Sequence, residues 1–456
     1  MQLLAYARTR AHASHRARKR ARAARRRSLE AREDVAWLKF AIVFAVAFGV
    51  TFVCVPLAKR IARVVGAIDY PGNRRVNTKP VPRCGGITMY LGFCAAAFTV
   101  FVGVRFFGWE LKNLYVLADV NYILLYAGIT LMFLVGLVDD ITQLSPAIKF
   151  GGQTIAAVIV VAAGISIGTA RIPITGDYIT FGWLDYPLSV LYLLVFVNIT
   201  NLIDGLDGLA SGVVAIVSAA LLYLVLMRGF ITMAFVCIAL IAVCLAFLCY
   251  NFFPASIFMG DSGSMLLGLM VGIVSVAGVA RTQSFVIMVV PLAIAGVPVL
   301  DTVSAIMRRL RGHQSIGQAD QEHLHHRLLK SGMSQKRSVA ILWTCTALLG
   351  IVGCVGSAYS GPIRWTIFFV LLIVVFLVIW RFGLFKPVLK HHYDNLGGRG
   401  PRLPRGSAYK ARVKAERAKQ AGAQGASQAE ITEIGEPAEP VVYADQAEAQ
   451  EGAANG

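Results

Sequence analysis

Long apolar runs separated by short polar connectors dominate the chain. The runs recur at roughly twenty residues each, the length that an α-helix needs to cross the hydrocarbon core of a bilayer. Candidate spans lie near residues 36–58, 85–106, 119–138, 150–170, 183–203, 208–227, 230–250, 262–280, 284–307, 338–358 and 363–386. The pattern therefore predicts an all-α polytopic integral membrane protein with about eleven transmembrane helices.

Two features of the pattern qualify this picture. The pair of spans within 208–250 could be divided differently, because its connector MRGFIT is short. A soluble multidomain enzyme is a poor alternative, since 57% of the residues are hydrophobic, only 15% are charged, and the runs lack polar faces. The eight cysteines form no C-x-x-C pair and mostly fall inside spans, which favours packing roles over disulfides or a zinc site.

Positive charge alternates between the connectors. The first, 59–84, and the ninth, 308–337, hold seven Lys or Arg each, whereas the even-numbered connectors hold one or two. Because positive connectors stay in the cytoplasm, the odd-numbered ones are expected there. With eleven spans, the N-terminus lies outside and the C-terminus lies inside.

The two ends of the chain read as appendages to a transmembrane domain at 36–386. Residues 1–35 hold eleven Lys or Arg, which disagrees with an external N-terminus. This segment could be a cytoplasmic arm that changes the topology, a ligand for anionic headgroups, or an extension absent from the mature protein. Its Ala/Arg composition shows no packing pattern and favours the last. The tail at 387–456 is expected to be disordered in the cytoplasm.

Polar residues gather at the odd-numbered connectors and at the span ends that meet them. Charges beside spans are costly, so this sorting predicts one cytoplasmic site assembled from several helix ends. The third, fifth and seventh connectors and the ninth span contribute Asp139, Asp140, Asn201, Asp204, Asp207, Asn251, Asp261 and Asp301. The ninth connector adds Arg308, Arg309, Arg311, His323, His325 and His326.

The carboxylates indicate a hard divalent cation, Mg²⁺ with Mn²⁺ as the alternative, which takes oxygen ligands and shares them with phosphates. Asp139 and Asp140 are adjacent and point about 100° apart on a helix, so they are expected to have different roles. Asp204 and Asp207 share a face if their helix continues through them. Gly205 and Gly208 favour a close backbone approach or a loosened turn there.

Other interpretations of these residues stay open. Asp261, followed by Ser262, could simply cap the eighth helix, and taken alone that is the more common role. The D-G-L-D-G spacing does not fit an EF-hand loop. A lone loop histidine is usually a surface residue, but three histidines within 323–326 favour donors to a sugar or phosphate over metal ligands.

A basic first connector completes the constellation. Its sequence DYPGNRRVNTKPVPRCGG sets prolines and glycines among cations, including Lys79 and Arg83, and Lys149 lies on the same expected face. Arginine can grip phosphate bidentately, although these charges could instead only enforce topology. Together, a metal site, many cations and a membrane location favour phosphoryl transfer from a soluble donor to a lipid acceptor.

In combination the motifs resemble the polyprenyl-phosphate N-acetylhexosamine-1-phosphate transferases, of glycosyltransferase 4 type. These motifs are DYPGNRRVNTKPVPRCGGI, GLVDD, NLIDGLDGLASG, YNFFPASIFMGDSGS and DTVSAIMRRLRG followed by HLHHRLL. The last pair looks more like the N-acetylglucosamine-1-phosphate branch than the muramoyl-pentapeptide branch. The resemblance covers residues 36–386, matches eleven spans and leaves 1–35 outside.

The resemblance implies a reaction and a set of roles. UDP-N-acetylglucosamine would give its sugar 1-phosphate to undecaprenyl or decaprenyl phosphate and release UMP, the first membrane step of an envelope glycan. Asp261 would be the principal Mg²⁺ ligand, with Asp139, Asp140 and Asp204 as further metal candidates, and Asp139 would also orient or deprotonate the lipid phosphate. Catalytic and substrate-binding roles would fall to His323, His325, His326, Lys79, Arg83, Lys149, Asn201, Asp204, Asp207, Asn251, Phe258, Arg308, Arg309 and Arg311, with Phe258 stacking on the base.

Two alternatives compete with this interpretation. The muramoyl-pentapeptide donor of peptidoglycan synthesis would keep the fold and the chemistry. A transporter would explain polar residues in spans, but these cluster at one face and no paired inverted repeats are visible. The expected partners are a UDP-sugar, a polyprenyl phosphate and the plasma membrane, with a homodimer as an open possibility and no nucleic acid.

Overall fold

The computed structural model describes residues 37–71, 79–109, 120–171, 178–279 and 334–359, together with the single positions 366, 370 and 373. Several sequence-based predictions lie outside these residues. They are the spans near 284–307 and 363–386, both terminal appendages, and the residues Asp301, Arg308, Arg309, Arg311, His323, His325 and His326.

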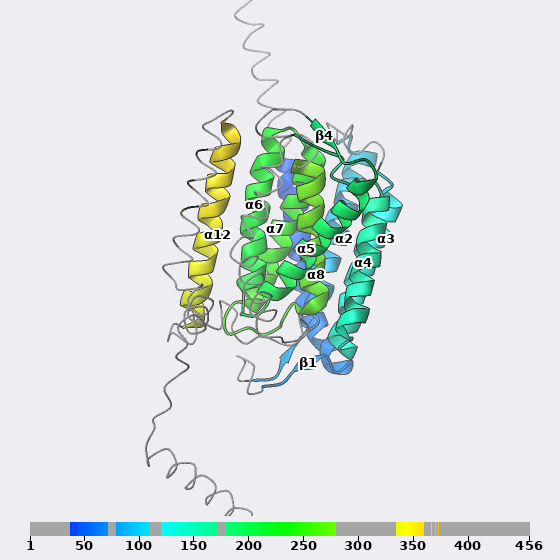
Figure 1. Ribbon diagram of the computed structural model, residues 1–456. Coiled ribbons are helices and arrows are strands. Elements are labelled where there is room, and N and C mark those ends of the chain that lie inside the picture. Colours follow the sequence, from blue (N-terminus) through cyan, green and yellow to red (C-terminus); the bar gives the residue numbers. More distant parts are fainter. Residues whose placement is uncertain are drawn as a thin grey trace, which may run out of the picture. The chain divides into compact units, whose positions relative to one another are not determined.

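Long helices make up most of the described chain (Figure 1). After a first helix, Trp37–Val64, they are α2 Gly86–Phe106, α3 Tyr122–Thr142, α4 Pro146–Ala162, α5 Asp185–Ile203, α6 Leu209–Met227, α7 Ile231–Asn251, α8 Gly260–Val274 and α12 Gln335–Ala358. Within the described ranges, eight helices are long and apolar enough to cross a membrane, and α4 is a shorter apolar helix. The expected polytopic helical membrane protein is confirmed.

Two short antiparallel hairpins interrupt the helices, so the chain is not purely helical. Strand β1 (Ile68–Asp69) pairs with β2 (Val81–Pro82), and β3 (Thr169–Arg171) pairs with β4 (Tyr178–Thr180), which precedes the 3₁₀ turn η2 (Gly182–Leu184). Figure 1 shows β1 and β4 at opposite ends of the helices. The first hairpin is built from the basic connector and lies at the end where the acidic residues gather.

The first helix continues to Val64 rather than ending near residue 58, so the connector that follows it is shorter than expected. The fourth span needs the clearest correction. Its helix runs from Pro146 to Ala162 rather than from 150 to 170, because Ser145 caps it and accepts a hydrogen bond from the N–H of Ile148 at 3.4 Å. Residues 169–171 belong to β3 instead. The pair within 208–250 does split as expected, since α6 and α7 are separate helices joined at residues 228–230.

Helix α8 is the most enclosed of the long helices, since all of its residues except Asp261 are buried inside the protein. It packs against α3 and α5 and holds glycines where these helices approach. A Cβ on Gly268 would lie 2.6 Å from the carbonyl oxygen of Phe196 in α5. Small residues let helix backbones approach closely inside membranes, so α8 forms the centre on which the polar ends of its neighbours converge.

Candidate active site

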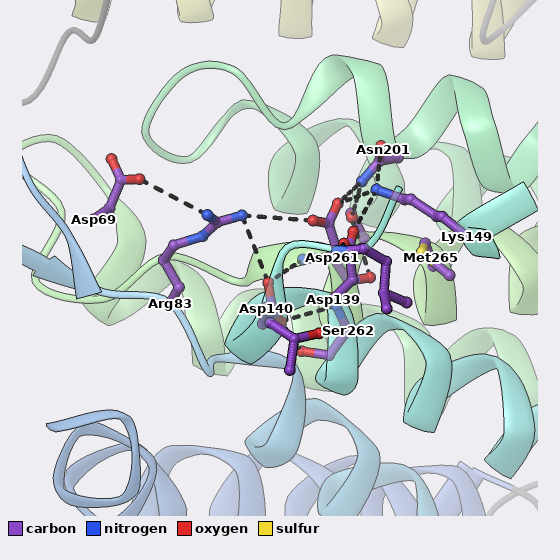
Figure 2. Close-up of polar contacts among 12 residues, drawn as sticks. Asp69, Arg83, Asp139, Asp140, Lys149, Asn201, Asp261, Ser262 and Met265 are labelled. Atoms are coloured by element: carbon purple, nitrogen blue, oxygen red, sulfur yellow. Dashed lines mark hydrogen bonds and ion pairs between the residues drawn. The ribbon is translucent and has the colours of Figure 1, made fainter. Parts of the chain in front are cut away.

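Asp139 and Asp140 lie in the last turn of α3, and both are buried. The helix ends at Thr142 because Gln143 adopts a left-handed conformation with φ 54°. The Oδ1 atom of Asp139 accepts a hydrogen bond from the N–H of Leu144 at 2.7 Å, which fixes one side of that carboxylate. Its other oxygen, Oδ2, points into the acidic cluster (Figure 2).

Asp140 caps the start of α8 from a neighbouring helix. Its Oδ1 accepts the N–H of Asp261 at 2.7 Å, and its Oδ2 accepts the N–H and hydroxyl of Ser262 at 3.1 and 2.6 Å. The first N–H groups of a helix have no partner within it, so a carboxylate there satisfies them and also favours the helix dipole. The sequence allowed Asp261 to be the cap of this helix, but the capping carboxylate is that of Asp140.

Glycines make this close approach feasible. Gly260 has φ +70°, and a Cβ there would collide with the carbonyl oxygen of Arg83 and the carboxylate of Asp140. Gly136 of α3 faces the backbone of Ser262, where a Cβ would lie 2.5 Å from its Cα atom. Only glycine fits positions of this kind, so the sequence at both places is set by the contact between α3 and α8.

Lys149, in the first turns of α4, joins two of the carboxylates. Its Nζ lies 2.9 Å from Oδ2 of Asp139 and 2.8 Å from Oδ1 of Asp261, and 3.5 Å from the side-chain oxygen of Asn201. The Asn201 amide nitrogen donates to the same Asp261 oxygen and to the Ser264 hydroxyl, the latter at 2.9 Å. Helices α3, α4, α5 and α8 thus meet around one ammonium group (Figure 2).

Arg83 brings the first hairpin into the same cluster. Its guanidinium lies 3.7 Å from Asp140, 3.5 Å from Asp261 and 3.9 Å from Asp69. Backbone hydrogen bonds hold the segment in place, from Phe258 N–H to Pro82 at 2.8 Å and from Gly85 N–H to Phe258 at 3.0 Å. The basic connector that precedes α2 is therefore anchored on the residues that precede α8.

Asp204 ends α5 and is half-buried beside this cluster. The helix does not continue through Asp204 and Asp207, so the condition under which they would share one face is not met. Burial holds the pKa of Asp204 well above its ordinary range, and the nearby charges of Asp261 and Asp140 raise this pKa further. A carboxyl kept in such a place costs stability unless a cation joins it.

Asp207, Asn251 and Phe258 order the loop between α7 and α8. Asp207 accepts the N–H of Ala255 at 2.9 Å. Asn251, buried, accepts the N–H of Gly208 and donates to the carbonyl of Ile257, both at 3.0 Å. The backbone of Phe258 pairs with β2, and its ring is half-buried. Their assignment to a uridine pocket stays a prediction.

Residues from five elements converge, and they carry both signs of charge. The cluster joins the acidic Asp69, Asp139, Asp140, Asp204 and Asp261 to the cationic Arg83 and Lys149. Within the described part of the chain, no three His, Cys, Asp or Glu side chains converge closely enough to enclose a metal ion. An ion there would need oxygens from a bound phosphate or from water, as Mg²⁺ often does.

Most residues of this cluster were predicted from the sequence, but Asp69, Ser262 and Ser264 were not. Lys79, also a candidate from the sequence, is exposed. Asp69, Ser262 and Ser264 were not singled out, although each lies inside a quoted motif. Each of these residues lies close in sequence to a candidate residue, which could have drawn attention to it. The sequence does not show the contact between helices that gives each residue its partner.

Comparisons with known proteins identify the family that the chain resembles. The pattern of Glycosyl transferase family 4 matches residues 122–279, which hold α3 to α8. The chain is 33% identical over 363 residues to the "Probable undecaprenyl-phosphate N-acetylglucosaminyl 1-phosphate transferase" of Bacillus subtilis (strain 168), covering 79% of this chain and 98% of that protein.

Two further relatives carry similar names. The chain is 34% identical to the "Decaprenyl-phosphate N-acetylglucosaminephosphotransferase" of Mycobacterium tuberculosis (strain CDC 1551 / Oshkosh), covering 71% of this chain and 84% of that protein. It is 24% identical to the "Undecaprenyl-phosphate alpha-N-acetylglucosaminyl 1-phosphate transferase" of Escherichia coli (strain K12), covering 76% of this chain and 93% of that protein.

Proposed function

The chain belongs to glycosyl transferase family 4, and we propose that it transfers N-acetylglucosamine 1-phosphate from UDP-N-acetylglucosamine to a polyprenyl phosphate, releasing UMP. The names of relatives that align over most of their length support this assignment. The family expected from the sequence motifs is confirmed by the same comparisons. The length of the polyprenyl chain, undecaprenyl in one relative and decaprenyl in another, is not part of the proposal.

One observation carries the proposal furthest. Asp139 and Asp261 are 122 positions apart in sequence, yet the Lys149 ammonium binds both at 2.9 and 2.8 Å. Two carboxylates held this close repel each other and need a cation between them. A site with this design accepts metal ions and phosphates, which is what pyrophosphate cleavage requires.

The position of the cluster suits two substrates of opposite solubility. The donor is water-soluble, whereas the acceptor keeps its tail in lipid and its phosphate at the headgroup plane. Helix ends are the rigid elements that reach that plane, and irregular backbone is tolerated there where it lines a polar site. The loop between α5 and α6, which holds Asp204 and Asp207, is such a place.

The cluster fits a hard divalent cation in its donor chemistry. It is made of carboxylate and amide oxygens with no sulfur or imidazole among the described residues that form it. Asp261 would be the principal ligand of Mg²⁺ or Mn²⁺, with Asp139 or Asp204 beside it and the remaining oxygens supplied by phosphate or water, because no three such side chains of the described residues converge. The two oxygens of Asp140 already accept three hydrogen bonds. When bound, the ion would neutralise charge on the donor pyrophosphate.

The other side chains have positioning roles in this account. Asp139 orients the lipid phosphate, which is already largely ionised at neutral pH, so holding it in line matters more than removing a proton. Arg83 and Lys149 are the described cations placed to contact phosphate oxygens. Asp207, Asn251 and Phe258 are proposed for the uridine side, and the arginines and histidines of 308–326 for the pyrophosphate and sugar.

The remaining topology is also a proposal. Eleven spans with an external N-terminus would place the carboxylate cluster on the cytoplasmic face of the plasma membrane, where nucleotide sugars are available. The basic first connector, which is anchored in the cluster through Arg83, supports this orientation. A homodimer is compatible with it.

A comparison of donors tests the proposal. The full chain, purified in detergent, is incubated with polyprenyl phosphate, Mg²⁺ and either UDP-N-acetylglucosamine or UDP-N-acetylmuramoyl-pentapeptide. The masses of the lipid products are then measured by mass spectrometry. We expect a lipid heavier by one N-acetylglucosamine phosphate, and none from the muramoyl donor. A product from the muramoyl donor alone would replace the proposed substrate with that of peptidoglycan synthesis.

A further inference from the structure

An apolar cavity of about 380 Å³ lies within the helices, apart from the carboxylate cluster. It is bounded by the first helix, α2, α3, α7 and α8, through side chains such as Val43, Phe93, Ala97, Ile129, Phe235 and Met270. Its volume falls in the range of roughly 300–1,000 Å³ that is typical of ligand sites in proteins. A cavity of this lining and size suits a hydrocarbon chain.

Most of the cavity lies toward the ends of the helices away from the carboxylates, although on α2 its lining runs from Val104 to Tyr90, one turn from the start of that helix. On α3 its lining ends at Ile129, ten positions before Asp139, which is about 15 Å along a helix axis. On α7 it begins at Thr232 in the first turn, and on α8 it ends at Ile273 near the last turn. On α3, α7 and α8 the lining is therefore confined to the half of each helix opposite the proposed reaction.

Two cations stand at that end of the cavity. Lys39 lies one turn before the lining residue Val43, and its Nζ sits 5.9 Å from the ring of Trp109, which stacks on the lining residue Phe235. Arg105, exposed in the last turn of α2, follows the lining residue Val104. Neither cation forms an ion pair with a carboxylate of the described residues.

One polar atom in the cavity lacks a partner. The Thr232 hydroxyl is buried and makes no hydrogen bond within the described chain, although Thr232 lines the cavity. An unpaired buried hydroxyl is costly, and a ligand with an acceptor oxygen just below its charged end would relieve that cost. A phospholipid has such an oxygen in the ester carbonyl between headgroup and acyl chain.

We propose that this cavity is a binding site for an anionic phospholipid. One acyl chain fills the cavity, the phosphate lies near Lys39 and Arg105, and an ester carbonyl accepts the Thr232 hydroxyl proton. The tail of the polyprenyl acceptor is a weaker candidate, because Lys39, Arg105 and the unpaired Thr232 hydroxyl lie at the end of the cavity away from the carboxylate cluster, where the acceptor phosphate has to be. The inference depends on the membrane location and the cavity, and not on the proposed transfer reaction.

Thermal stability in detergent tests the site without measuring activity. The full chain is melted with added phosphatidylglycerol or with phosphatidylcholine, and co-purified lipid is counted by native mass spectrometry. We expect phosphatidylglycerol to raise the midpoint by several degrees and phosphatidylcholine by much less, since binding to the folded state stabilises it by mass action. Equal shifts with the two lipids would overturn the proposal.

A matched pair of substitutions on α2 locates the effect. Ala97→Phe fills the cavity, whereas Ala95→Phe makes the same change two positions away, outside the lining. Phosphatidylglycerol binding should weaken roughly tenfold or more in Ala97→Phe and stay unchanged in Ala95→Phe. If Ala97→Phe does not fold, Thr232→Val keeps the side-chain shape and should reduce the shift by itself.

Charge and competitor experiments complete the test. Replacing Lys39 and Arg105 by Gln should lower the shift with phosphatidylglycerol to that with phosphatidylcholine. The proposal is overturned if Ala97→Phe and Ala95→Phe respond alike, or if Thr232→Val binds as tightly as the parent. It is also overturned if polyprenyl phosphate, and not phosphatidylglycerol, produces the shift that Ala97→Phe removes, because the occupant is then the acceptor tail.

Discussion

The Asp140 carboxylate accepts a hydrogen bond from the backbone N–H of Asp261 at 2.7 Å, across the contact between α3 and α8. Asp140 also accepts two hydrogen bonds from Ser262, so one buried carboxylate holds the first turn of α8. The position of Asp261, the leading candidate for a metal ligand, is thereby set by a residue of another helix. The adjacent acids of α3 have separate partners, Lys149 for Asp139 and the α8 backbone for Asp140.

The capping role predicts a loss of both stability and activity in Asp140→Ala. Removing the acceptor leaves buried N–H groups unpaired, which costs on the order of 1–3 kcal/mol. Turnover should fall far more than the melting temperature suggests, because Asp261 is displaced. Ser262→Ala removes only the hydroxyl bond and should cost about 1 kcal/mol with most activity kept. Equal activity in Asp140→Ala and Ser262→Ala would contradict the capping role.

The close approach at Gly260 predicts that no larger residue is tolerated there. Gly260→Ala places a methyl group against the Asp140 carboxylate and the Arg83 carbonyl oxygen, so activity should be lost. Gly66→Ala is the matched control, because Gly66 has a similar φ of +75° but open space around it. Its cost should be limited to backbone strain of about 1–2 kcal/mol, read from thermal melts, with activity retained.

The bridging position of Lys149 predicts that its charge is essential. In Lys149→Met, Asp139 and Asp261 repel each other without compensation, and breaking a buried pair of this kind costs about 3–5 kcal/mol. We expect turnover to drop by at least about a hundredfold, a change of roughly 2.7 kcal/mol in the barrier.

Lys59→Met is the control for that substitution. Lys59 is a half-buried lysine that bonds the Ser256 hydroxyl at 2.9 Å and lies over the Tyr250 ring, apart from the cluster. It should keep most of the activity. Comparable losses in the two variants, measured as initial rates at saturating substrates, would show that the bridge has no special role.

The raised pKa of Asp204 predicts a trade between stability and function. Because its pKa is higher in the folded than in the unfolded chain, the charged form destabilises the fold, and this penalty grows as pH rises above the ordinary Asp range of about 4. Asp204→Asn should therefore melt a few degrees higher than the parent at pH 8, with a smaller gain at pH 5, while losing activity.

Asp185→Asn is expected to change the melting temperature in the opposite direction. Asp185 is also buried, but it accepts hydrogen bonds from the N–H of Gly168 at 2.8 Å and from the Ser189 hydroxyl at 3.2 Å. Weakening these charge-assisted bonds should lower the melting temperature. A lower melting temperature for Asp204→Asn at both pH values would show that its carboxylate is stabilised in the fold.

The sequence predicted the helices and the members of the cluster better than their contacts. Apolar length identifies a membrane span because lipid allows few other structures, which is why the described spans match their expected places within a few residues. The fourth span was misplaced because its start signal, Ser145 followed by Pro146, lies outside the apolar run.

The pattern of apolar and polar residues could not predict contacts between residues that are far apart in sequence. That Asp140 caps α8, or that Lys149 joins Asp139 to Asp261, depends on how four helices pack, which spacing along one helix does not encode. Gly260 and Gly136 are required because α3 and α8 approach closely at these positions. A glycine in the sequence indicates a close approach but does not show which element approaches it. Asp204 and Asp207 could not be placed for a similar reason, because α5 ends at Ile203, before both of them.

Release of UMP tests the central claim most directly. The purified full chain is given UDP-N-acetylglucosamine, polyprenyl phosphate and Mg²⁺, and each component is omitted in turn. The account predicts that UMP appears only when lipid and metal are both present, and that Asp261→Asn, which keeps the shape of the side chain, abolishes it. UMP release that continues without the metal, or that survives in Asp261→Asn, would contradict a metal-assisted transfer at this cluster.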